Sequence, residues 1–338
     1  METKQYYIPE ENLQKLVNSL IEKGADVLAP VRDDAGKVNF NKVTDAALCD
    51  IHYVQSVFSA KLAAFPPVEK LFEYTINKDG QKITDSIPTD IPETVLFATH
   101  PCDAAAFSVL KAVFTWDTVD AHFMERYNKL TVISMACTTG DAHCFCTSVG
   151  SSPDATAGSD IMLTTLEGGG YIADILTEKG VSIFERNKEL FTDYDGKGNK
   201  IVASIEKKFE LSELQQNLEG AFENPVWAEQ AMRCLGCGAC AYVCPTCSCY
   251  DIQDEGTAYK GKRLRCWDTC ALSNFTMHTS GHNPREGQPE RWRQRILHKF
   301  AYQPERLSIL GCVGCGRCSR GCPADMNIVE HLQIITQK

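Results

Sequence analysis

Residues 234–245 read Cys-Leu-Gly-Cys-Gly-Ala-Cys-Ala-Tyr-Val-Cys-Pro, and residues 312–323 read Cys-Val-Gly-Cys-Gly-Arg-Cys-Ser-Arg-Gly-Cys-Pro. In each run three cysteines are separated by two residues, a fourth follows after three more, and a proline comes next. Three thiolates at this spacing reach three corners of one metal cluster. The fourth thiolate is displaced by a turn, stiffened by the proline, and reaches a neighbouring cluster. The repeat therefore predicts a module organised by two clusters.

This spacing is typical of the ligand runs of bacterial two-cluster ferredoxins. We expect two [4Fe-4S] cubanes, each with three ligands from one run and the fourth from the other. The ligands of the first cluster are then Cys234, Cys237, Cys240 and Cys322. The ligands of the second cluster are Cys312, Cys315, Cys318 and Cys244. The alternative is a pair of four-thiolate zinc sites, although zinc sites usually combine two separated Cys-x2-Cys pairs.

The composition limits the class of protein. A chain of 338 residues with 43% hydrophobic and 23% charged residues is expected to form two globular domains. Residues 1–24 predict an amphipathic helix without the features of a signal peptide, and no apolar run approaches the length of a membrane span. With 17 cysteines, these features predict a cytoplasmic, oxygen-sensitive protein whose thiols are metal ligands. A net charge of −10 argues against a nucleic-acid partner.

The N-terminal part alternates between strand and helix patterns. Phe107, Leu110 and Phe114 recur at helical spacing within a helix expected over residues 103–114. Strands and a hairpin are expected at residues 25–31, 94–98, 130–134, 161–166 and 171–176. These elements predict an α/β or α+β domain over residues 1–192.

A polar, turn-rich stretch follows this domain. We expect residues 193–223 to form a linker that includes a charged helix at residues 211–218. Residues 224–338 are then a two-cluster ferredoxin-like, mainly helical module organised by its metal ligands. Residues 245–311 form a long insertion between the two ligand runs, and an insertion of that size is usually functional.

Four further cysteines form a first additional group: Cys102, Cys137, Cys144 and Cys146. Cys102 and Cys137 each follow a predicted strand, at the sheet edge where α/β proteins place functional loops. The four thiols are expected to hold a third [4Fe-4S] cluster. His100 and His143 lie beside them in the sequence and are expected to tune or hydrogen-bond this site.

A second additional group lies in the insertion: Cys247, Cys249, Cys266 and Cys270. Their closeness to the first ligand run predicts a further metal site, so the total is three clusters, or four if both groups bind metal. Alternatively, these thiols simply pack as small apolar residues. We favour metal binding in at least one group, because unpaired exposed thiols are chemically reactive. The isolated Cys49 is expected in the core.

A basic helix is expected after Pro289. Its cationic residues are Arg291, Arg293, Arg295 and Lys299. They form either a solvated face or a source of positive charge that raises a cluster potential and steers an acidic partner. Trp292 and Phe300 are expected on its inner face, and His282 and His298 receive no catalytic role.

The sequence has no complete Gly-x-Gly-x-x-Gly loop before a helix, so we expect no nicotinamide or flavin site in this chain. It also offers no defensible combination of nucleophile, base and orienting residue, and no catalytic residue is assigned. The expected chemistry is one-electron transfer through clusters.

The ordered motifs resemble the beta subunit of cytoplasmic sulfhydrogenases and the A-type subunit of anaerobic sulfite reductases. The resemblance runs from about residue 90 to the C-terminus. It rests on His-Pro-Cys-Asp at 100–103, Cys-Phe-Cys-Thr-Ser-Val-Gly at 144–150, Asn-Pro-Val-Trp at 224–227, Cys-Pro-Thr-Cys-Ser-Cys-Tyr at 244–250 and Trp-Asp-Thr-Cys at 267–270. This chain has His100 where the family usually has Arg, and Cys266 is not a usual family cysteine.

The resemblance implies a non-catalytic electron-relay subunit. Its implied partners are two other subunits: a flavin-containing, NAD(P)H-oxidising diaphorase, and a catalytic reductase or hydrogenase. A competing hypothesis is that the chain itself reduces a substrate at a cluster held by only three thiols, such as Cys247, Cys249 and Cys270.

Overall fold

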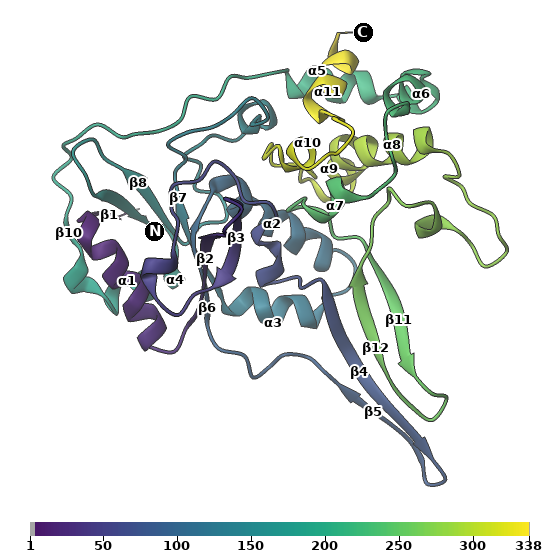
Figure 1. Cartoon of the computed structure of the whole chain (residues 1–338), viewed down its shortest axis with the longest axis horizontal. Helices are drawn as coiled ribbons and strands as arrows, with labels where there is room; N and C mark the ends of the chain where they lie inside the picture. The colour runs from purple at the N-terminus through teal and green to yellow at the C-terminus, as the bar shows by residue number, and fades with distance from the viewer. Residues whose placement is uncertain (1–3, 338) are drawn as a thin grey trace.

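The computed structural model describes residues 4–337 (Figure 1). Its N-terminal part contains an eight-stranded sheet in the order β10-β1-β9-β8-β7-β6-β2-β3. The central strands β8, β7, β6 and β2 are parallel, and the outer pairings are antiparallel. The strands are β1 (Lys4–Ile8), β2 (Asp26–Arg32), β3 (Val38–Lys42), β6 (Thr94–Thr99), β7 (Leu130–Met135), β8 (Ile161–Thr165), β9 (Tyr171–Ile175) and β10 (Thr192–Asp193).

Helices cover both faces of this sheet. The helices are α1 (Glu10–Glu22), α2 (Pro101–Phe114), α3 (Ala121–Lys129) and α4 (Glu178–Glu185). Successive side chains of a strand point to opposite faces. In β6, Val95 and Phe97 therefore pack in the core that contains α1 and α4, whereas Leu96 packs in the core that contains α2 and α3. The mixed α/β architecture expected for this part is confirmed.

The strands and helix expected between residues 25 and 176 are present within a few residues of the predicted bounds. One expectation was wrong. Residues 4–8 form strand β1, which pairs with β9 and β10 next to the edge of the sheet, and the first helix begins only at Glu10. Pro9 stands at the boundary in an extended conformation, because proline fixes φ and is tolerated only at the start of a helix. The start of that predicted helix, residues 1–3, lies outside the described residues.

Two hairpins from distant parts of the sequence form a second sheet in the order β11-β12-β4-β5. Its strands are β4 (Val68–Asn77), β5 (Gly80–Asp85), β11 (Tyr250–Gly256) and β12 (Lys260–Trp267). Figure 1 shows both hairpins projecting together from the body of the molecule. Since β11 and β12 belong to the 245–311 insertion, the expected mainly helical character of the C-terminal module is not confirmed. Asp79-Gly80, a strong hairpin signal, could have predicted the first hairpin.

A buried ionic network joins this second sheet to the N-terminal part. Arg265 of β12 donates to Glu69 of β4 and to Asp120 at the start of α3. Glu69 also accepts from Arg126 of α3. The side chains of Arg265 and Glu69 are each only 2% exposed. Each charge is therefore compensated by a partner rather than by water.

The remaining helices form a second body with its own apolar core. They are α5 (Leu211–Leu218), α6 (Val226–Ala231), α7 (Ala239–Tyr242), α8 (Gln288–Leu297), α9 (Gln303–Leu307), α10 (Arg317–Arg320) and α11 (Ile328–Thr336). A π-helical turn, His298–Tyr302, joins α8 to α9. Trp292 packs in the centre of this core and donates to Gln230, which in turn donates to the carbonyl of His331. None of the helices in residues 4–337 is both long and apolar enough to cross a membrane.

The predicted linker, residues 193–223, divides into two pieces in the structure. Residues 194–210 contain no helix and make one isolated bridge, between Lys200 and Leu166. The predicted helix at 211–218 is present as α5, and its Leu214 and Leu218 are buried in the helical core. Helix α5 thus packs as part of the C-terminal body.

We expect Glu69→Ala to destabilise the junction between the two sheets. The change removes one of the two carboxylates that compensate the buried Arg265, so the free energy of unfolding should fall by about 3 kcal/mol, as found when a buried ion pair is broken. Urea unfolding of the purified protein measures this change. Glu73→Ala is the matched control on the same strand, because Glu73 is exposed and pairs only with Lys70 at the surface. Equal effects of the two substitutions would contradict the prediction.

Candidate metal centres

Glycines shape the second ligand run where it meets the N-terminal part. Gly314 and Gly316 have φ values of +67° and +70°, a region that side chains rarely adopt. A Cβ at Gly314 would lie 2.5 Å from the Cα of Cys146, and one at Gly316 would lie 2.4 Å from the carbonyl oxygen of His143. The Phe145 amide donates to the Gly314 carbonyl at 2.9 Å. Only glycine therefore lets this run touch the loop that carries the first additional cysteine group.

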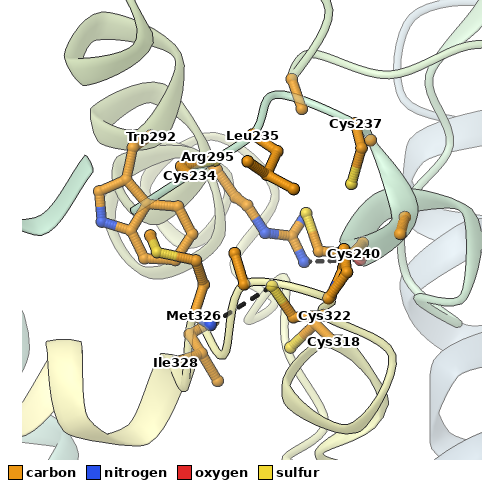
Figure 2. Close-up of a pocket in the computed structure, with 15 residues that line it drawn as sticks. Cys234, Leu235, Cys237, Cys240, Trp292, Arg295, Cys318, Cys322, Met326 and Ile328 are labelled. Atoms are coloured by element: carbon orange, nitrogen blue, oxygen red, sulfur yellow. Dashed lines mark hydrogen bonds between the residues drawn. The ribbon is translucent and has the colours of Figure 1, made fainter. Parts of the chain in front are cut away.

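A first cavity is surrounded by thiols of both ligand runs (Figure 2). Its thiols are Cys234, Cys237, Cys240, Cys318 and Cys322. Trp292 and Ile328 provide an apolar wall. Gln288 donates to Sγ of Cys234 at 2.9 Å, and the Met326 amide donates to Sγ of Cys322 at 3.3 Å. The four thiols predicted for the first cluster thus lie around one cavity.

A second cavity is lined by Cys244, Cys312, Cys315 and Cys318, the four thiols predicted for the second cluster. Lys299 points at it from the π-helical turn. Its Nζ donates to Sγ of Cys244 at 3.3 Å, to Oγ1 of Thr246 at 3.0 Å and to the Gly311 carbonyl at 2.7 Å. The structure therefore brings this set together beside a buried cation.

A third cavity is lined by the first additional group, Cys102, Cys137, Cys144 and Cys146, together with Cys315. Cys102 lies in the first turn of α2, directly after β6, and Cys137 follows β7. These two strands are parallel neighbours, so their carboxyl ends meet at one edge of the sheet. The four thiols expected to share a site lie together there.

The three cavities form a continuous row. Cys318 lines both the first and the second cavity, and Cys315 lines both the second and the third. Gln55 also bridges the last two, because its Nε2 donates to the Cys315 carbonyl at 3.3 Å and to Sγ of Cys102 at 3.6 Å. Neighbouring cavities thus have lining residues in common.

Two cations of the predicted basic helix lie inside the protein rather than on its surface. Arg295 and Lys299 are each only 4% exposed. Arg295 donates to the Cys240 carbonyl at 2.9 Å and to Sγ of Cys247 at 3.6 Å. Burial alone would lower the pKa of both cations, but the neighbouring thiolates raise the pKa of each above its usual value. Both side chains remain charged, and each places positive charge among the thiols.

Arg317 connects the second ligand run to the N-terminal part. Its guanidinium forms a two-pronged ion pair with Asp103 of α2 and donates to the carbonyl and hydroxyl of Ser56. The side chains of Arg317 and Asp103 are each 1% exposed. Sequence reasoning missed this pair, because Arg317 stands inside a ligand run and nothing local indicates its partner.

Arg320 makes a second connection next to the third cavity. It donates to Sγ of Cys144 at 3.2 Å, to the Cys315 carbonyl at 2.6 Å and to Asp141 at 2.7 Å. Burial would raise the pKa of Asp141, but the hydrogen bond and charge of Arg320 outweigh it and lower the pKa to about 2. Asp141 therefore stays ionised and anchors Arg320 against the thiol.

His100 lines the third cavity, as its neighbourhood in the sequence predicted. Its ring stacks on Tyr53 with 4.2 Å between the ring centroids. Burial, followed by the charges of Arg317 and Arg320, lowers the pKa of His100 to about 3. The imidazole is therefore neutral beside the thiols.

The second additional group does not assemble as predicted. The neighbouring Cys244 raises the pKa of the Cys247 thiol, and the neighbouring Cys249 lowers the pKa of the Cys270 thiol to about 6. Cys266 instead lies within β12, opposite Asp251, and its nearest polar contact is Gln253. Cys266 follows the buried Arg265 along the strand, so its side chain lies on the opposite face of the projecting hairpin. The four-thiol site is thus not brought together.

Lys61 is a further buried cation beside the cysteines of the insertion. Sequence reasoning missed Lys61, which is buried, donates to the Cys247 carbonyl at 3.0 Å and lies 3.9 Å from the ring centroid of Trp267. Burial lowers the pKa of Lys61. Cys49, expected in the core, is half-buried at the rim of a separate cavity beside α1.

The donor sets fit cubane clusters better than single ions. The thiols line the walls of cavities, and in residues 4–337 no group of three or more His, Cys, Asp or Glu side chains is arranged to hold one metal ion. Thiolates with apolar walls and hydrogen-bond donors are the usual setting of iron–sulfur clusters. This geometry disfavours the zinc alternative.

Comparison with known proteins supports the same chemistry. Residues 233–326 match the family model described as a 4Fe-4S dicluster domain. The chain resembles an iron–sulfur subunit of a sulfhydrogenase. It is 29% identical to the Sulfhydrogenase 2 subunit beta of Pyrococcus furiosus, over 98% of this chain and 96% of that protein. No solved structure matches the chain. The expected resemblance to the sulfhydrogenase beta subunit is confirmed, as is the assignment of the chain to iron–sulfur electron transport.

We expect Arg317→Met to weaken the contact between the two parts of the molecule. The substitution leaves Asp103 buried without its cation, which should lower the free energy of unfolding by about 3–5 kcal/mol. The double variant Arg317→Met with Asp103→Leu should recover most of this loss, since apolar residues often replace a buried ion pair at little cost. Denaturant unfolding of the single and double variants measures the coupling. A double variant as unstable as the sum of the two single variants would contradict the prediction.

Proposed function

We propose that this chain is a non-catalytic electron-relay subunit that passes single electrons through three [4Fe-4S] clusters. The ligands of cluster 1 are Cys234, Cys237, Cys240 and Cys322. Those of cluster 2 are Cys312, Cys315, Cys318 and Cys244. Those of cluster 3 are Cys102, Cys137, Cys144 and Cys146.

The row of cavities carries this proposal. Each cavity shares one ligand cysteine with its neighbour, so the proposed clusters follow one another without an intervening layer of protein. Electrons can pass along such a row because each cluster lies next to the following one, whereas clusters far apart could not exchange electrons. The exposed Cys237 belongs to cluster 1, which makes that end of the row reachable by a partner.

The chain's own residues set the conditions for transfer. When bound, the clusters supply one-electron redox chemistry. Lys299 and Arg295 place buried positive charge near the ligands of clusters 1 and 2, which favours the reduced, more negative state. Arg320 and Gln55 donate to thiols of cluster 3, and hydrogen bonds to ligand sulfurs have the same effect. The apolar walls of Trp292 and Ile328 limit the access of water at cluster 1.

The proposed partners are an NAD(P)H-linked flavin subunit together with a catalytic reductase or hydrogenase subunit, in a cytoplasmic complex. The name of the relative supports a multi-subunit assembly, because that protein is one subunit of a sulfhydrogenase. The chain's part in such a complex is to connect the two redox sites.

Anaerobically purified protein should contain about twelve iron and twelve acid-labile sulfide atoms per chain, four for each cubane. Cys137→Ala should lower both values to about eight, because the third cluster would keep only three of its four thiolate ligands. Cys266→Ala is the control and should leave them unchanged, since Cys266 lines none of the three thiol-lined cavities. About four iron atoms or fewer in the wild type, or zinc in their place, would overturn the cluster assignment.

The relay itself is tested by separating the chain from its partners. The isolated chain should accept electrons from a reduced artificial donor, with bleaching of its visible absorbance, and should return them to a one-electron acceptor without reducing sulfite, sulfur or protons. When the natural complex is purified intact, the chain should co-purify with two other subunits. One of them should bind flavin, and the other should carry a nickel–iron or sirohaem centre. Substrate turnover by the isolated chain would favour the three-thiol reductase hypothesis instead.

A further inference from the structure

A separate cavity of about 610 Å³ lies beside helix α1. Sites for small molecules usually measure about 300–1,000 Å³. None of the residues that line this cavity lines one of the three thiol-lined cavities. The cavity therefore has the size of a small-molecule site and is distinct from the candidate metal centres.

The cavity lies at the carboxyl edge of the parallel strands. Phe97, one of its lining residues, is near the carboxyl end of β6. Tyr171, another lining residue, pairs with Thr165, the last residue of β8. Open α/β sheets bind their ligands just outside this edge of the strands. The cavity thus has the position as well as the size of a ligand site.

The lining combines an apolar floor with an acidic rim. Leu13, Val17 and Phe97 form the floor, and each is no more than 5% exposed. Glu10 and Glu11, in the first turn of α1, are exposed and line the same cavity. A molecule in this space would meet hydrocarbon on one side and carboxylates on the other.

The two glutamates of the rim are not charge-compensated by ion pairs. Within residues 4–337 neither of them takes part in a salt bridge. The third carboxylate of the lining, Asp50, is paired with Arg32 at 2.5 Å. A carboxylate in the first turn also stabilises its own helix. The charge of Glu10 and Glu11 therefore does not by itself indicate a ligand.

Tyr171 provides an independent indication. It is 4% exposed, yet its hydroxyl has no hydrogen-bond partner in the part of the chain that the structure describes. Buried tyrosine hydroxyls usually have a partner, and the hydroxyl of Tyr53 donates to the Ala98 carbonyl at 2.9 Å. The Glu10 carboxylate is close by, because a Cβ at Gly169, in the turn before Tyr171, would lie 3.5 Å from its Oε2. A hydroxyl and a carboxylate are thus both open to a ligand at this side of the cavity.

We propose that this cavity binds a small organic cation, a primary amine with an apolar tail. The ammonium group would donate to the carboxylates of Glu10 and Glu11 and to the hydroxyl oxygen of Tyr171. The tail would pack on the apolar floor, where its burial is favourable. An anion of the same shape would be repelled by the two carboxylates.

The ligand would contact a segment that also borders the third thiol-lined cavity. His52 lines the amine cavity, and Gln55, three residues later, lines the cavity of the first additional cysteine group. Between them, Tyr53 stacks on His100. A bound cation would therefore lie one short loop away from the proposed third cluster. The inference itself needs no cluster and is independent of the relay proposal.

The test is isothermal titration calorimetry of the complete, cluster-loaded protein under anaerobic conditions. The probes are two amines, phenethylamine and hexylamine, and one anion of similar shape, hydrocinnamate. We expect one saturable site for at least one amine and no saturable binding of the anion. The amine should bind more weakly as sodium chloride is added, because salt screens exposed charges.

Substitutions locate the site. Glu10→Gln and Glu11→Gln should each weaken amine binding about two- to five-fold, the usual effect of one exposed ion pair, and the double variant about ten-fold. Tyr171→Phe keeps the ring, removes one acceptor and should weaken binding about three-fold. Glu22→Gln is the matched control, because Glu22 is an exposed residue at the other end of α1 and does not line the cavity. It should leave the affinity unchanged.

Three results would overturn the inference. The first is a wild-type protein that shows no saturable binding of either amine at millimolar concentration. The second is hydrocinnamate binding as tight as amine binding, and the third is equal weakening by Glu10→Gln and Glu22→Gln. The wild-type comparison of amine with anion decides the question if a variant does not fold.

None of these results affects the relay proposal, which depends on the wild-type iron content. A low iron content in a protein that still binds the amine would instead reject the relay and retain the amine site.

Discussion

The burial of positive charge among thiolates is the constraint on which the rest of this structure depends. Arg295, Lys299 and Arg317 are nearly inaccessible to water, and an isolated charge in such a position would be prohibitively unstable. Each is compensated by nearby thiolates or by a carboxylate. The thiolates need the cations for the same reason. The ligand runs and the cationic side chains around them therefore form one electrostatic unit.

This requirement explains why the two parts of the chain are joined so closely. The third cavity takes its four group cysteines from the N-terminal part and borders on Cys315 of the C-terminal part. Gly314 and Gly316 permit the close approach of the two parts, and the ion pair between Arg317 and Asp103 stabilises it. A ferredoxin-like module alone would lack this third site. The α/β domain thus extends the row of thiols rather than serving only as a support.

The projecting sheet and the relay meet in one region. The base of the β11–β12 hairpin carries Cys249 and Cys270, and Arg265 on β12 is held by the network that contains Glu69 and Asp120. The hairpin is anchored at this end by the buried ion pairs of Arg265 and is exposed at the other. Every residue of β11 and β5 is exposed, so the far end has no core of its own.

Local sequence determined the features that depend on spacing. Ligand runs and strand patterns are local, because a thiolate's reach and a strand's alternation are set by neighbours in the chain. They predicted the two sets of four thiols, the central strands and the strand-end position of Cys102 and Cys137. The grouping of these last two with Cys144 and Cys146 also followed, since parallel strands end at one edge of a sheet.

Only the tertiary structure decided which distant residues meet. It separated Cys266 from its sequence neighbours, because an alternating strand turns that thiol away from the group. It placed Lys61 and Arg317 against partners far along the chain, and it paired two hairpins that lie more than a hundred residues apart into one sheet. Such contacts depend on how complete elements pack and on which charges must be compensated once water is excluded, and no local pattern records either.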